Sequence, residues 1–189
     1  MLKGARCETA RCGFTRRDYP PGMHAWRRSK FSAYGVQLRE KQKLKRFYGV
    51  YERQFRRYIE EAERKKGNTG EHLLIALEKR LDNVVCHLGL AASRSQARQL
   101  ITHGHLDVNG RRVTIPSLPV RAGDVIAPRQ KESTTKLIAS VRESIKGRAV
   151  PSWLEVNEEP LQGRVLNLPV REDVSVEIRE QLIVELCSK

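Results

Sequence analysis

Apolar residues recur at helical spacing in six stretches of the chain, most of them bounded by residues that suit a helix terminus. Ser32 can cap a first helix that runs to about residue 47, and Gly49 supplies its stop. The same spacing predicts helices over residues 54–66, 69–89, 93–104, 131–148 and 180–187. Residues 1–31 show no such period and contain Pro20-Pro21-Gly22, so we expect an irregular arm there.

Between residues 93 and 127 the pattern changes from helical to alternating. Ser93 and Gln96 form a capping box at the start of a helix. Asn109-Gly110 then separates residues 105–108 from 111–114, which predicts a tight β-hairpin because both turn residues tolerate positive φ. Further strands are predicted at residues 125–127, 153–156 and 164–168. These patterns together predict an α+β fold, in which a helix-turn-helix and a small antiparallel sheet accompany a helical domain.

Charge is distributed unevenly along the 189 residues. Lys and Arg number 36 and Asp and Glu 22, a net charge of +14, and residues 1–66 carry +12 of it, with +3 over 67–130 and −1 over 131–189. Aromatic residues are interleaved with this charge: Phe14, Tyr19, Trp26, Phe31, Tyr34, Phe47, Tyr48, Tyr51, Phe55 and Tyr58. Arginine with aromatic side chains suits phosphates and unstacked bases, so a polyanionic partner is expected, nucleic acid before an anionic membrane surface.

The motifs of several enzyme classes are missing from the sequence. There is no Gly-rich phosphate loop, no dinucleotide fingerprint and no Gly-x-Ser-x-Gly elbow. His103 and His105 lie on either side of a predicted helix end, a position that suits contacts with carbonyls or phosphate better than metal binding. Asp82 lies beside Arg80, which predicts a structural ion pair rather than a catalytic acid. No apolar run approaches the roughly 18 residues of a membrane span, so we expect a soluble protein.

The four cysteines fall into two kinds of surroundings. Cys7 and Cys12 form a Cys-x4-Cys pair in the basic arm, whereas structural zinc normally needs four ligands. His24 is a candidate third ligand and no fourth is evident, which favours two thiols over zinc. Cys86 and Cys187 lie in apolar helical stretches and are expected to pack as small hydrophobic residues.

Several of these motifs together resemble a known family. Five motifs between residues 80 and 124 show the resemblance: Arg80-Leu81-Asp82-Asn83-Val84-Val85, Ser93-Arg94-Ser95-Gln96-Ala97-Arg98-Gln99-Leu100, His103-Gly104-His105, Val108-Asn109-Gly110 and Gly123-Asp124. They resemble the RNA-binding module named for ribosomal small-subunit protein S-four. The flanks resemble the bacterial-type S-four ribosomal family itself, through Tyr19-Pro20-Pro21-Gly22, Leu38-Arg39-Glu40-Lys41-Gln42-Lys43, Tyr48-Gly49-Val50, Glu52-Arg53-Gln54-Phe55-Arg56 and Gln181-Leu182-Ile183-Val184-Glu185-Leu186.

The resemblance implies an architecture and a set of partners. The basic arm would span residues 1–31, the RNA-binding module residues 80–165 and the helical domain residues 32–79 with 166–189. Small-subunit ribosomal RNA would be bound in its 5′ domain at a helix junction, early in assembly. Arg27, Arg28 and Lys30 match positions that line the tunnel through which mRNA enters, and the C-terminal segment would contact ribosomal protein S-five, an interface linked to translational accuracy. No cofactor is expected, because Cys7 and Cys12 match only the second of the two cysteine pairs of zinc-bearing members, and zinc would be expected only with a further N-terminal cysteine pair.

Candidate RNA-binding residues come from the basic arm, the first two helices and the module. Arg94 and Arg98 lie four residues apart, so both can face one groove of the RNA backbone. Only one of Arg111 and Arg112 can share that face, and Arg111 is favoured because it is nearest the turn. The complete predicted set is Arg16, Arg17, Arg27, Arg28, Lys30, Lys41, Lys43, Lys45, Arg46, Arg53, Arg56, Arg57, Arg94, Arg98, His103 and Arg111.

Two other classes of protein share parts of these patterns. An RNA-modifying enzyme can carry the same module, but it needs a catalytic domain, and only short helices and strands lie outside the module here. A helix-turn-helix DNA binder could use residues 81–103, but the basic arm lies far from its recognition helix in the chain and no dimerisation segment is evident. A structural RNA-binding protein of the small ribosomal subunit is therefore the favoured interpretation.

Overall fold

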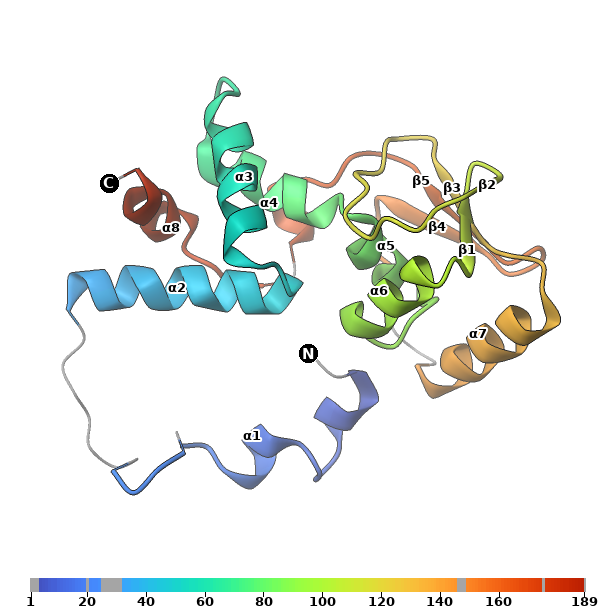
Figure 1. Ribbon diagram of the computed structural model, residues 1–189, viewed down its shortest axis with the longest axis horizontal. Coiled ribbons are helices and arrows are strands. Elements are labelled where there is room, and N and C mark those ends of the chain that lie inside the picture. The colour runs from blue at the N-terminus through green and yellow to red at the C-terminus, as the bar shows by residue number, and fades with distance from the viewer. Residues whose placement is uncertain (1–3, 20, 25–31, 146–148, 175, 189) are drawn as a thin grey trace.

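A computed structural model describes residues 4–19, 21–24, 32–145, 149–174 and 176–188 (Figure 1). Helices α2 (Ala33–Tyr48), α3 (Glu52–Glu63), α4 (Thr69–Glu78) and α8 (Glu180–Cys187) form one part, in which α8 packs on α2 and α4, and α3 on α4. The short 3-10 helix η2 (Arg171–Asp173) leads into α8. No described helix is both long and apolar enough to cross a membrane.

The second part contains the sheet. Helices α5 (Leu81–His87) and α6 (Arg94–Thr102) precede strands β1 (Leu106–Val108), β2 (Arg111–Arg112) and β3 (Val125–Pro128). Helix α7 (Glu132–Ser144) follows, and then strands β4 (Leu154–Asn157) and β5 (Gln162–Val165). All neighbouring strands are antiparallel, in the order β2-β1-β3-β5-β4. The expected α+β fold class is therefore confirmed.

Each part has its own buried cluster. Leu44, Tyr48, Phe55, Leu73 and Ile183 belong to the cluster among the helices α2, α3, α4 and α8. The cluster of the second part lies between its helices and its sheet. Figure 1 shows the two parts side by side, with the end of α4 leading directly into α5. The chain crosses from one cluster to the other at Lys79 and Arg80.

The apolar stripe over residues 69–89 predicted a single helix, and this prediction is wrong. Helix α4 ends at Glu78 and α5 begins at Leu81, because Arg80 is extended (φ −66°, ψ 136°). The loop before β3 accounts for the break: the N–H of Leu81 donates to the carbonyl of Leu118 at 2.9 Å, and the N–H of Val120 donates to the carbonyl of Lys79 at 2.9 Å. These bonds join residues about forty apart in the chain, so local spacing carries no sign of them.

The arm contains more regular structure than expected. A 3-10 helix η1 (Gly4–Glu8) and one turn of α-helix, α1 (Gly13–Arg16), interrupt it. Gly4 is buried, and a Cβ at this position would lie 2.6 Å from the carbonyl oxygen of Ala92, next to α6. The start of the arm therefore packs against the second part rather than lying wholly in solvent.

Candidate nucleic-acid interface

Helix α6 carries Arg94 and Arg98, and it begins as its sequence predicts. The Ser93 hydroxyl accepts a hydrogen bond from the N–H of Gln96 at 3.3 Å, which satisfies one of the unpaired donors of the first turn. The reciprocal bond of the predicted capping box is shifted by one residue, since the Gln96 side chain accepts from the N–H of Ala92 at 2.8 Å. The two arginines thus project from a helix whose first turn is fixed.

The guanidinium of Arg98 faces the end of α2. Its Nη1 donates to the carbonyl of Gly49 at 2.9 Å, and its Nη2 donates to the carbonyl of Tyr48 at 3.2 Å. Gly49 ends α2 in the left-handed conformation (φ 62°), so these are carbonyls at a helix C-terminus, where a cation is favourable. Arg98 therefore joins the second part to the helical part.

Asp82 holds Arg98 in that position and binds Arg80 as well. Arg98 donates from Nε at 3.1 Å and from Nη2 at 2.6 Å, both to Oδ2 of Asp82, which is only 1% exposed. Arg80 donates to both carboxylate oxygens, at 3.0 and 2.7 Å, and its Nη1 donates to the Tyr58 hydroxyl at 2.8 Å. Burial alone would lower the pKa of Arg80, but the hydrogen bonds and charge of Asp82 raise it above its usual value. The expected Arg80–Asp82 ion pair is confirmed.

A second buried carboxylate, Glu78, lies on the same boundary. The Tyr48 hydroxyl donates to its Oε1 at 2.5 Å, the Asn83 amide donates to its Oε2, and Nε2 of His87 lies 3.3 Å from Oε2. Burial alone would raise the pKa of Glu78, but the nearby His87 ring and the Tyr48 hydroxyl lower it. Burial, together with the negative charge of Glu78, raises the pKa of Tyr48 well above its usual value.

Arg94 completes this network from α6. Its Nε donates to the side-chain oxygen of Asn83 at 2.6 Å, and its guanidinium lies 4.0 Å from the ring centroid of Phe47 and 5.2 Å from that of Tyr48. A planar cation over aromatic rings is a stable packing arrangement. Arg94 and Arg98 therefore do share one side of α6, but both guanidinium groups are engaged with the helical part, and Arg98 remains 34% exposed.

Helix α3 presents an open cationic face. Arg53, Arg56 and Arg57 are exposed, on the side opposite the buried Phe55 and Ile59, as their spacing predicts. Arg56 pairs with Glu52 across one turn at 3.2 Å, whereas Arg53 and Arg57 form no ion pair with any described residue. This face can offer its charge to a partner without breaking internal contacts.

The lysines of α2 differ from one another in their surroundings. Lys41 and Lys45 both bind Glu52, at 2.8 and 2.6 Å, with side chains only 12% and 14% exposed. Hydrogen bonds from these two lysines lower the pKa of Glu52 to about 2. Lys43 is half exposed and donates to the carbonyl of Glu177 at 2.5 Å, and Arg46 is exposed. Three of the four predicted cations of this helix, Lys41, Lys43 and Lys45, thus make contacts inside the protein.

The predicted hairpin forms between β1 and β2. Asn109 (φ 51°) and Gly110 (φ 75°) make its turn, and the Asn109 side chain accepts from the N–H of Val125 at 2.9 Å. Arg111 and Arg112 are both exposed, but the guanidinium of Arg112 lies over Gly104 at the end of α6, where a Cβ would collide with it. It is thus Arg112, rather than the favoured Arg111, that approaches this helix.

His103 is exposed at the C-terminus of α6. Its ring centroid lies 6.1 Å from that of His105, and His105 in turn has Nδ1 at 2.9 Å from the Thr134 hydroxyl. In the arm, Arg16 and Arg17 are exposed beside α1. The remaining predicted residues of the arm, Arg27, Arg28 and Lys30, lie outside the described residues.

The cysteine pair of the arm does not make a metal site by itself. Backbone N–H groups of Thr15 and Phe14 hydrogen-bond the Cys12 sulfur and lower its pKa, with a smaller contribution from Cys7. Among the described residues no group of three or more His, Cys, Asp or Glu side chains could hold a metal ion. A structural zinc needs four ligands, so this donor set does not fit one.

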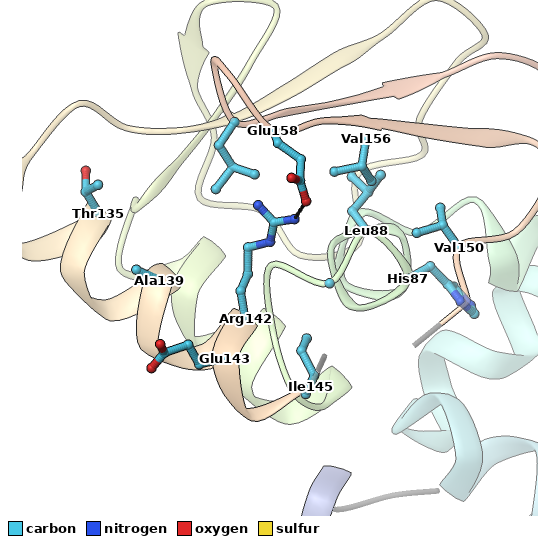
Figure 2. A pocket seen from close by; sticks show the side chains of 12 residues that line it. His87, Leu88, Thr135, Ala139, Arg142, Glu143, Ile145, Val150, Val156 and Glu158 are labelled. Atoms are coloured by element: carbon cyan, nitrogen blue, oxygen red, sulfur yellow. Dashed lines mark hydrogen bonds and ion pairs between the residues drawn. The ribbon is translucent and has the colours of Figure 1, made fainter. Parts of the chain in front are cut away.

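A mostly apolar cavity of about 590 Å³ lies between α7 and the hairpin of β4 and β5 (Figure 2). Leu88, Val150 and Val156 contribute apolar walls, and the guanidinium of Arg142 crosses the opening to Glu158 at 2.8 Å. Glu158 is 78% exposed. Two charged groups of the lining, Arg142 and Glu158, therefore neutralise one another.

The sequence patterns did not predict a role for Glu78 or the link between Arg98 and Asp82. The available signal was the group of charged residues Glu78, Lys79, Arg80 and Asp82 inside an otherwise apolar helical stripe. Charged side chains that fall on the buried side of a helix are paired in most proteins, so this run could have indicated an internal network.

Comparison with known proteins gives matches along the whole chain. The model of the family described as "Ribosomal protein S4/S9 N-terminal domain" matches residues 1–78, and that described as "S4 domain" matches residues 79–126. The small ribosomal subunit protein uS4 of Trichlorobacter lovleyi is 55% identical over 189 residues, covering 100% of this chain and 91% of the relative. Those of Thermoanaerobacter pseudethanolicus and Acetivibrio thermocellus are 57% and 55% identical over 188 residues, covering 100% of the chain and 90% of each relative.

A helical part joined to an S4 domain, with a strong excess of positive charge, defines an RNA-binding protein of the ribosome. The full-length matches are more specific. The chain belongs to the uS4 family of small ribosomal subunit proteins. It is a structural protein and not an enzyme, and these matches do not favour the RNA-modifying enzyme. Its place is the ribosome, which is cytoplasmic in bacteria.

Proposed function

We propose that this protein binds the 5′ domain of small-subunit ribosomal RNA at a multi-helix junction and nucleates assembly there. The observation that carries this proposal is the open cationic face of α3, where Arg53 and Arg57 are exposed without internal ion pairs. Arginine suits a junction because its planar fork can hold one phosphate through two hydrogen bonds. Arg46 at the end of α2 and Lys43 add exposed charge from the neighbouring helix.

The module would contribute a second RNA contact. Arg111 and His103 are exposed at the hairpin and at the end of α6, and neither forms an ion pair with another described residue. Arg94 and Arg98 would act mainly by holding the two parts at a set angle, and the exposed side of Arg98 would face RNA. Lys41 and Lys45 would support this surface through Glu52.

The division into domains is part of the proposal. The helical domain would comprise residues 32–79 and 166–189, with residues 80–165 inserted as the RNA-binding module and residues 1–31 as a basic arm. The two separate buried clusters support this division, since one contains only residues from 44–77 and 174–183 and the other only residues from 81–165.

Three further roles rest on the family resemblance alone. Arg27, Arg28 and Lys30 of the arm would reach the tunnel where mRNA enters the subunit, the C-terminal segment would contact ribosomal protein S-five, and this contact would affect translational accuracy. A basic arm of this kind suits a path between RNA helices.

The experiment is a binding titration with a 5′-domain RNA fragment, a scrambled RNA and a matched DNA. Selective binding to the first is expected, with a loss of roughly 10³ to 10⁵ in affinity between 50 and 200 mM salt. Replacing Arg53 and Arg57 by Gln should weaken this binding, whereas the same change at Arg142 and Arg164 should leave it unchanged. Equal affinity for all three nucleic acids would overturn the proposal.

A further inference from the structure

A second cationic site lies on the boundary between the two parts. Of the residues that line it, only Arg57 belongs to the predicted set of RNA-binding residues. This site is a cavity of about 430 Å³ where α3, the end of α4 and the loop before β3 meet. Arg57, Glu61 and Lys65 line it at four-residue intervals along α3 and its C-terminal extension, and Lys79 closes it from the end of α4. Ser117 and Pro119 of the loop form another wall of the cavity. Gln54 and Tyr58 of α3, with Ile75 and Ala76 of α4, complete its lining.

Backbone hydrogen bonds fix the walls of this cavity relative to one another. The N–H of Val120 donates to the carbonyl of Lys79 at 2.9 Å, and Arg80 forms an isolated antiparallel bridge with Pro119. Arg80 is held in turn by Asp82 and by the Tyr58 hydroxyl, which lines the cavity from α3. A ligand in this cavity would meet preformed walls from both parts of the protein, which lowers the entropic cost of binding.

The charge around the cavity is not balanced within the protein. Arg57, Lys65 and Lys79 line the cavity, and Glu61 is the acidic residue of the lining. The positive charge of Arg121 is close enough to lower the pKa of Lys79. Within the described part of the chain none of the four cations forms an ion pair. By contrast, the partly buried Lys41, Lys45, Arg80 and Arg98 are each paired with a carboxylate.

Lys79 is the most enclosed of these four cations. Its partial burial, and then the positive charges of Lys65 and Arg121, lower its pKa below the usual value. An anion in the cavity would remove this repulsion. Lys79 is partly buried and forms no ion pair with a described residue, which is uncommon in a folded protein. Its grouping with the exposed, unpaired Arg57 and Lys65 at one cavity indicates a site for an anionic ligand.

We propose that a phosphate of the RNA backbone occupies this cavity and is bound by Lys65 and Lys79, with Arg57 and Arg121 at its rim. The inference rests on the proposed RNA-binding function and deepens it. Because the ligand would touch α3 and α4 together with the loop before β3, one phosphate would tie the helical part to the module. RNA binding would then stabilise the angle between the two parts that Asp82 and Glu78 set in the free protein.

The test compares two doubly substituted full-length proteins of equal net charge. Lys65→Gln with Lys79→Gln removes the two central cations of the cavity, and Lys131→Gln with Lys136→Gln removes two exposed lysines at the start of α7, which lies away from α3 (Figure 1). Affinity for the 5′-domain RNA is measured across about 50 to 200 mM KCl. The cavity variant should bind about tenfold more weakly, as expected for lost hydrogen bonds to a charged group.

The salt dependence gives a readout that altered packing alone does not change. The slope of log affinity against log salt should become shallower by about 0.9 for one lost phosphate contact, and the α7 variant should keep the wild-type slope. Affinity and slope equal to those of the α7 variant would overturn the proposal. If the wild-type protein does not prefer the 5′-domain RNA, the proposed function itself fails, and that result is separate.

Lysine acetylation of the unsubstituted protein tests the same site without a mutation. The RNA should protect Lys65 and Lys79 from acetylation and leave Lys131 and Lys136 reactive. Inorganic phosphate at the same ionic strength should protect neither pair, because a free ion lacks the neighbouring contacts of the RNA. Equal protection by inorganic phosphate would make the cavity a site for free anions and overturn the assignment to RNA.

Discussion

Arg98 and Asp82 form an ion pair with Nη2 of the guanidinium 2.6 Å from Oδ2 of the carboxylate, and the same guanidinium donates to the carbonyls of Tyr48 and Gly49. The pair thus joins α5 and α6 to the end of α2. Arg80 donates to both oxygens of the same Asp82 carboxylate and to the Tyr58 hydroxyl on α3. One buried carboxylate, that of Asp82, therefore connects the second part to two helices of the helical part, α2 and α3.

Replacing Asp82 by Ala should destabilise the protein strongly. The change leaves Arg80, which is 3% exposed, without its counter-charge, and removal of one member of a buried ion pair costs about 3 to 5 kcal/mol. The midpoint of urea unfolding measures this loss. The exposed pair of Arg142 and Glu158 provides the control, since Glu158→Ala should cost at most about 1 kcal/mol. Equal effects of the two substitutions would contradict the role given to Asp82.

Gly163 to Ala should destabilise the module by about 1 to 3 kcal/mol through overpacking. Gly163 is buried in β5, and a Cβ there would collide with the side chain of Leu88, which belongs to the buried cluster of the module. Gly13→Ala is the matched control, because nothing lies within 4 Å of a Cβ at that position and its φ is not positive. Equal midpoints of thermal unfolding for the two variants would contradict overpacking, since Leu88 could then move aside.

Glu52 should contribute to acid sensitivity. Its pKa is lowered to about 2 by hydrogen bonds from Lys41 and Lys45, against 4.5 in an unfolded chain. A lowered carboxyl pKa in the folded state means that the stabilisation is present above pH 4.5 and is lost as the pH falls through 2. Glu52 is 35% exposed, so solvent screening limits the effect to about 1 kcal/mol.

The variant Glu52→Gln tests this assignment. It should be less stable than the wild type at pH 7, and the difference should shrink as the pH falls from 4.5 toward 2. Urea midpoints measured across that range check the result. A difference that stays constant with pH would show that the carboxylate charge is not responsible.

Ser93 to Ala should cost about 1 kcal/mol, the usual effect of losing an N-terminal cap. The Ser93 hydroxyl accepts from the N–H of Gln96, so the first turn of α6 would lose one hydrogen bond. Because Arg94 belongs to this turn, RNA affinity should fall as well. Ser93→Asp should restore both stability and affinity, since aspartate also caps helices. Failure of the aspartate to restore stability would argue against capping as the cause.

Local patterns predicted many of the elements correctly. The final helix was expected at residues 180–187 and is observed over Glu180–Cys187, and Ser32 and Gly49 bound α2 as expected. The hairpin at Asn109-Gly110 formed for the reason given, because both residues have positive φ. Caps, turns and apolar periodicity involve residues a few positions apart, which a sequence displays directly.

Residue types and near neighbours are enough to predict most of the elements, the uneven charge and the family resemblance. The packing of distant segments sets where the helical stripe over 69–89 breaks, since the loop before β3 supplies the hydrogen bonds at Lys79 and Leu81. It also decided that Arg94 and Arg98 face α2, because helical spacing sets which side of α6 they share and only packing sets what lies opposite that side. The cavity around Lys79 is of the same kind, since its walls come from α3, α4 and a loop that is about forty residues distant in the chain.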